Sequence, residues 1–97
     1  MIIHLRLYGV FKSAVGSDRI ELDFSSSNPT VRLALAQMLS RAEYSGLRNL
    51  ILDAESSDPR PSTLILVDGR EIGALSGMDT GLRDESELSL LPIAHGG

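Results

Sequence analysis

Two segments near the N-terminus alternate apolar and polar residues with a period of two, and this pattern constrains the fold more than any other feature. They are IIHLRLY, residues 2–8, and RIELDF, residues 19–24. Such alternation is typical of strands that bury one face and expose the other. The side chains that would face inward are all apolar: Ile3, Leu5, Leu7, Ile20, Leu22 and Phe24. The sequence therefore predicts an antiparallel hairpin, joined by a long turn between Gly9 and Gly16 that contains at most one turn of helix.

A single long amphipathic helix is predicted to follow the hairpin. Thr30 is a good candidate for its N-cap, and Asn28 followed by Pro29 is the alternative. Apolar residues then recur with the helical period and form one continuous stripe: Val31, Ala34, Leu35, Met38, Leu39 and Ala42. Polar residues occupy the opposite side, so we expect the stripe to pack into the core.

The C-terminal half is predicted to contain shorter elements. Residues 44–52 suit a second short helix, and residues 53–62 have the composition of a loop. Strands are predicted at residues 63–68 and 87–93. This order of elements predicts an α+β fold, a mixed sheet with one main helix packed across it. If the first and last strands lie side by side, they are parallel, and the C-terminal tail leaves from the centre of the sheet.

Length and composition limit the organisation and the partners. We expect residues 1–93 to form one domain and residues 94–97 to form a flexible C-terminal tail, because 97 residues supply a single core. The net charge is -4 and no basic stripe is present, so direct binding to nucleic acid is not expected. No apolar run is long enough for a membrane span or a signal peptide. A cytoplasmic protein without a membrane partner is expected.

The sequence offers no self-contained active site. It has no cysteine, only two histidines, and none of the glycine-rich loops that cradle phosphates. We therefore expect no metal site, no bound cofactor and no enzymatic activity. If this protein takes part in chemistry, it does so as the substrate of another enzyme.

The last two residues are Gly96 and Gly97, and glycine is the residue that costs most to order. A frayed end and a remnant of cloning are two explanations. The third is functional: a terminus without Cβ atoms can be threaded into the narrow active site of another enzyme. There its carboxylate could be adenylated by ATP, and the acyl group of the adenylate could then be transferred to sulfur.

Several stretches resemble the ubiquitin-like sulfur carriers. They are TVRLALAQML, TLILVDGREI and LSGMDTGLRDESELSLLPIAHGG. That group includes the small subunit of molybdopterin synthase, the thiamine-biosynthesis carrier and the ubiquitin-related modifier. The final HGG and the segment RPSTLILVDG are similar to the ubiquitin-related modifier, whereas LSGMDTGLRDESELSLLPI is equally similar to the molybdopterin-synthase type. The resemblance spans essentially the whole chain and implies a β-grasp fold.

The resemblance also implies a function. Gly97 would supply the carboxylate that an activating enzyme adenylates with ATP and that then becomes a thiocarboxylate, and Gly96 would provide clearance. The sulfur would serve molybdopterin biosynthesis or tRNA thiolation, so the large subunit of molybdopterin synthase or a tRNA thiolation enzyme is an expected partner. Two alternatives remain: a modifier conjugated through Gly97 to lysines of target proteins, and a passive β-grasp interaction module.

In this family an exposed apolar patch on the open face of the sheet docks the activating enzyme. The corresponding candidates are the outward positions Ile65 or Val67, together with Leu91 and Ile93, and His95 in the tail is a further candidate for contact with a partner. The segments LILV and LLPI are apolar on both faces, which supports this assignment because one helix covers only one face. The alternative is that residues 44–52 bury the other face.

Overall fold

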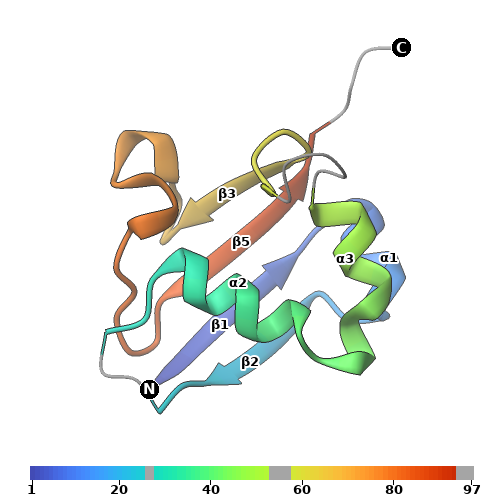
Figure 1. Ribbon diagram of the computed structural model, residues 1–97, viewed down its shortest axis with the longest axis horizontal. Helices are drawn as coiled ribbons and strands as arrows, with labels where there is room; N and C mark the ends of the chain where they lie inside the picture. The colour runs from blue at the N-terminus through green and yellow to red at the C-terminus, as the bar shows by residue number, and fades with distance from the viewer. Residues whose placement is uncertain (26–27, 53–57, 94–97) are drawn as a thin grey trace.

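The structure, a computed structural model, describes residues 1–25, 28–52 and 58–93 (Figure 1). Within these residues one sheet has the strand order β2-β1-β5-β3-β4. Its strands are β1 (Ile2–Leu7), β2 (Arg19–Asp23), β3 (Thr63–Val67), β4 (Arg70–Glu71) and β5 (Glu87–Pro92). β1 and β5 are parallel, and the other neighbouring strands are antiparallel. The predicted mixed sheet, with its parallel first and last strands, is confirmed.

The N-terminal hairpin forms as the alternating pattern predicts. Ile3 lies opposite Leu22 and Leu5 lies opposite Ile20, and all four side chains are buried. Cross-strand apolar pairs of this kind fix the register, because a slip by one residue would turn each of them towards solvent.

The main helix is α2 (Val31–Leu39), which lies across the sheet in Figure 1. Its N-cap is Thr30, whose hydroxyl accepts a hydrogen bond from the Leu33 amide at 3.2 Å. The first five residues of the predicted stripe are buried: Val31, Ala34, Leu35, Met38 and Leu39. The helix ends at Leu39, and Ala42 lies in a separate 3₁₀ turn with its side chain exposed.

Two shorter helices complete the covered side of the sheet. α3 (Ser45–Ile51) confirms the predicted second helix and packs against both α1 and α2. α1 (Gly9–Val15) replaces most of the turn that was predicted there. It forms because Phe11 is buried in the core. The free energy gained by burying this side chain offsets the entropy cost of ordering a short helix.

The start of α1 lies against the end of β5. Gly9 has a φ of +55°, and a Cβ on this residue would lie 3.0 Å from Cγ of Pro92. Gly16, the C-cap of α1, has a φ of +82° but no atom within 4 Å of its Cβ position. Glycine is therefore required at both ends of α1 for its conformation, and at Gly9 also for space.

We predict that Gly9→Ala lowers the free energy of unfolding more than Gly16→Ala. Both variants place a Cβ on a left-handed residue, which costs about 1–2 kcal/mol. Only the alanine at position 9 also meets Pro92. Urea unfolding followed by circular dichroism measures the two changes. Equal losses would show that the close approach to Pro92 carries no energetic cost.

Candidate functional site

The sheet has one covered face and one open face. Figure 1 views it from the helical side, where α2 lies in front of the strands. The described residues place no element over the opposite face, because α3 packs with α1 and α2 on the covered side. The alternative in which residues 44–52 bury the other face of the strands is therefore wrong.

The open face carries an apolar patch at its centre. We define the open-face patch as Leu64 and Leu66 of β3, Leu91 of β5 and Ile93, which follows β5. Leu64 lies opposite Leu91 in the register, and their side chains are 36% exposed and partly exposed, respectively. Ile93 is 40% exposed, and its amide donates a hydrogen bond to the carbonyl of Ser62 at 3.0 Å. An apolar patch along central strands is the kind of surface that a partner protein covers.

The prediction that Ile65 or Val67 points outward is wrong. Their side chains are 1% and 7% exposed, on the helical face. They lie opposite Leu90 and Leu88, which are completely buried there. The outward residues of β3 are instead Leu64 and Leu66, each shifted by one position from the prediction.

The polar residue at the start of β3, Thr63, explains why the predicted outward positions of this strand differ from the observed ones by one residue. Thr63 is buried, and its hydroxyl donates a hydrogen bond to the carbonyl of Ile51 at 3.3 Å. A polar residue at the start of a strand otherwise suggests an outward position. The four apolar residues that follow give no alternation to correct that impression. The orientation of β3 follows from its register with β5, in which Ile65 and Val67 lie opposite the buried Leu90 and Leu88.

The remaining tail candidates lie outside the described residues. His95, Gly96 and Gly97 belong to residues 94–97, so their assigned roles stay predictions. Leu91 and Ile93 lie on the open face as predicted, next to the point where the described chain ends. The role of these two residues in binding a partner also stays a prediction.

A cationic group borders the open-face patch on β1. The guanidinium of Arg6 lies over the ring of Tyr8, 5.5 Å from its centroid, and 3.8 Å from the carboxylate of Glu87. Its Nε is buried and makes no hydrogen bond within the described residues, whereas the side chain as a whole is 26% exposed. The exposed part of the guanidinium can donate to a carbonyl or carboxylate of a docked partner.

At the other end of β1, His4 connects the sheet to the turn that precedes β5. Its Nε2 lies 2.5 Å from a carboxylate oxygen of Glu85. The same turn is held by Asp84, whose carboxylate accepts a hydrogen bond from the Ile2 amide at 2.7 Å. The hydrogen bond to Glu85 is the main cause that raises the pKa of His4 above its ordinary value of 6.5.

The described residues contain neither a metal site nor a membrane span. Within residues 1–25, 28–52 and 58–93, no three histidine or acidic side chains lie close enough together to hold a metal ion. In the same part of the chain, no helix has the length and apolar character needed to cross a bilayer.

Comparison with known proteins gives relatives that match along the whole chain. No protein-family model matches. Small archaeal modifier protein 3 of Haloferax volcanii is 32% identical over 97 residues, which is the full length of both chains. The crystal structure of SAMP1 from Haloferax volcanii matches with a TM-score of 0.82 and 18% identity over 100% of both chains. Urm1 from Trypanosoma brucei matches with a TM-score of 0.76 and 22% identity, over 99% of this chain and 95% of that one.

The fold and these solved structures define a protein with a ubiquitin-like β-grasp fold. The predicted resemblance and the predicted fold are both confirmed. The chain belongs to the family of small archaeal modifier proteins, because it is 32% identical to a member over its full length.

We predict that the imidazole of His4 titrates above 6.5 and that Glu85→Gln returns its pKa towards that value. The carboxylate of Glu85 holds the protonated imidazole only in the folded protein. The stabilisation is therefore fully present below about pH 6.5, the pKa in the unfolded chain, and is lost as the pH rises through the raised pKa. An NMR titration in the His95→Gln background leaves one imidazole to observe. An unchanged pKa in the Glu85→Gln variant would contradict the assignment.

Proposed function

We propose that this protein is a sulfur carrier whose working group is the carboxylate of Gly97. The supporting observation is the combination of family membership with a Gly-Gly terminus that follows the central strand of the sheet. The carboxylate enters the active site of an adenylating enzyme, which uses ATP. This chain binds no cofactor of its own in the proposal.

The proposed chemistry has two steps. In the first, a carboxylate oxygen of Gly97 attacks the α-phosphorus of ATP, and pyrophosphate leaves. In the second, a donor at the oxidation level of sulfide attacks the carbonyl carbon of the acyl-adenylate. AMP leaves, the sulfur loses its proton, and the product is a thiocarboxylate. Gly96 and Gly97 suit this passage because neither has a side chain to obstruct a narrow channel.

Docking on the activating enzyme is assigned to the open-face patch. Its four apolar side chains are continuous with the chain segment that leads to the tail, so an enzyme that covers the patch also receives Gly97. Arg6 beside the patch offers the exposed part of its guanidinium to an acceptor on that enzyme. His95 lies between the patch and the glycines in sequence and would contact the same partner.

The sulfur acceptor is proposed from the same resemblance. It is the large subunit of a molybdopterin synthase or a tRNA thiolation enzyme. Either would take the thiocarboxylated tail into its own active site.

Conjugation to proteins is the second candidate, and the relative named as a small archaeal modifier protein favours it. Here the amine of a target lysine attacks the activated carbonyl, AMP leaves, and an isopeptide bond forms. Conjugation to a second copy of this chain would be restricted. Lys12 is its one lysine, and the N-terminal amine donates a hydrogen bond to the carbonyl of Phe24 and lies 3.6 Å from the carboxylate of Asp23.

We predict that the full chain, incubated with the activating enzyme of its host, ATP and sulfide, gains the mass of one oxygen-to-sulfur exchange. A variant that lacks Gly96 and Gly97 should gain nothing, because no terminal glycine carboxylate can be threaded into the enzyme. Intact mass spectrometry measures both. A plain carboxylate in the full chain would contradict the carrier role. A ladder of larger species in host extracts that disappears with the two glycines would support conjugation, and a host phenotype unchanged by their deletion would indicate a passive module.

We also predict that Leu64→Glu reduces formation of the adenylate at least tenfold without unfolding the protein. A charge in the middle of the open-face patch must be desolvated when a partner covers it. Leu50→Glu is the matched control, because Leu50 is a leucine of similar exposure, 41%, on α3 at the helical side. Pyrophosphate release measures the reaction, and circular dichroism checks the fold. Equal activity in the two variants would remove the open face from the docking surface.

A further inference from the structure

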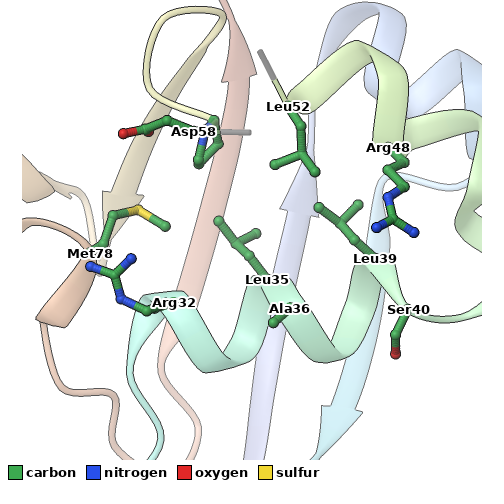
Figure 2. Close-up of a pocket in the computed structure, with 10 residues that line it drawn as sticks. Arg32, Leu35, Ala36, Leu39, Ser40, Arg48, Leu52, Asp58 and Met78 are labelled. Carbon is green, nitrogen blue, oxygen red and sulfur yellow. The ribbon is translucent and has the colours of Figure 1, made fainter. Parts of the chain in front are cut away.

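A second concave surface lies on the helical side, away from the open-face patch. It is a groove of about 390 Å³ between α2, α3, residues 58–59 and the 3₁₀ turn that contains Met78 (Figure 2). Its floor is apolar and consists of Leu35, Ala36, Leu39, Leu52, Pro59 and Met78. Figure 2 shows the side chains of Leu35 and Leu39 rising from α2 and that of Leu52 pointing towards them.

Most of this floor is the outer surface of the core. Leu35, Leu39 and Met78 are buried, so they are held in place by the fold and leave the groove preformed. Ala36 is exposed and leaves the centre of the groove open, because its side chain is a single methyl group. A preformed apolar groove of this size takes one or two side chains of a ligand.

Two arginines lie at opposite ends of the groove. Arg32 is in the first turn of α2, and its Nε is 3.3 Å from the carboxylate of Asp79. Its terminal nitrogens make no hydrogen bond within the described residues. Arg48 comes from α3, and Figure 2 places its guanidinium above the last turn of α2, near Leu39 and Ser40.

Arg48 lines the groove without a partner among the described residues. It makes no hydrogen bond or ion pair with the described part of the chain, whereas the two aspartates around the groove each hold an arginine. Asp79 holds Arg32, and Asp58 holds Arg60 at 2.6 Å, which lowers the pKa of Asp58 to about 2. Each end of the apolar floor therefore carries a guanidinium: that of Arg32 is paired through Nε with Asp79, and that of Arg48 has no partner among the described residues.

We propose that this groove binds an extended segment of a partner protein in which two carboxylates flank one apolar side chain. The charges complement Arg32 and Arg48, and the apolar side chain covers Ala36 between Leu35 and Leu39. The proposal concerns the helical side alone and does not depend on activation of the tail.

The length of the groove sets the spacing in the partner. From Arg32 to Ser40 the helical backbone rises about 12 Å, at 1.5 Å per residue. In an extended segment, residues i, i+2 and i+4 point to the same side and span about 13 Å. The pattern acid–x–apolar–x–acid therefore sets both carboxylates and the apolar side chain against the groove together. A partner helix would need about eight residues for the same span and is too wide for a groove of this volume.

The test uses the full chain and two synthetic peptides with blocked ends. One is Ser-Glu-Thr-Leu-Thr-Glu-Ser, and the other has the same composition with its glutamates adjacent, Ser-Ser-Thr-Leu-Thr-Glu-Glu. Titrations of the isotope-labelled protein are followed by NMR. We expect the first peptide to shift the amide signals of α2, α3 and the turn at Met78, and to bind at least threefold more tightly than the second.

Two variants and their matched controls locate the contact. Arg48→Gln should weaken binding of the first peptide about three- to fivefold, as loss of an exposed charge pair does. Ala36→Glu should weaken it about tenfold, because it fills the floor and repels the glutamates. Arg70→Gln on β4 and Ala14→Glu on α1 change exposed residues of the same types elsewhere and should leave binding unchanged.

Four outcomes would overturn the proposal. They are no binding, equal binding of the two peptides, an effect of the control variants as large as that of Arg48→Gln, and self-association of the chain through the same amides in sedimentation experiments. A tenfold gain in affinity in an Asp53→Asn, Glu55→Gln double variant would also overturn it, since the arginines would then serve acids of the same chain.

Discussion

The parallel pairing of β1 with β5 is the constraint on which the rest of the structure depends. It places the last strand beside the first, at the centre of the sheet, so that Leu88 and Leu90 complete one apolar layer with Leu5 and Leu7. Two parallel neighbours cannot be joined by a tight turn. The chain must therefore cross from one end of the sheet to the other between them, and the helices of this long connection lie on one side of the sheet. The same pairing brings the end of β5 against the start of α1, where Gly9 meets Pro92.

Coverage on one side alone creates the two surfaces that can serve a partner. On the open side, β3 and β5 are central strands with apolar residues that no helix covers, and Leu64 faces Leu91 there. These leucines are only partly buried in the folded monomer. The apolar area that remains exposed would contribute to binding if another protein removed it from water. Arg6 borders this surface, and its partly exposed guanidinium can donate a hydrogen bond to a partner.

The sequence predicted those elements whose pattern depends on one periodicity. The N-terminal hairpin and α2 each have a single buried face, so their alternation and their stripe determine the orientation of every side chain. β3 differs because both faces are apolar, and its orientation depends on the register with β5, which no local pattern encodes. α1 was missed for a related reason: seven residues with one buried aromatic, Phe11, form a helix only because the core accepts that side chain.

The separation of the two surfaces has a consequence for how a carrier could pass between enzymes. The open-face patch and the arginine-flanked groove lie on opposite sides of the sheet, so occupation of one leaves the other accessible. A protein held through its groove could still present its patch and tail to an activating enzyme. The tail, however, can enter only one active site at a time, since there is one terminal carboxylate. Exchange between enzymes would then require release of the open face but not of the groove. Separate surfaces of this kind let a single small domain stay bound to one partner while its tail enters the active site of another.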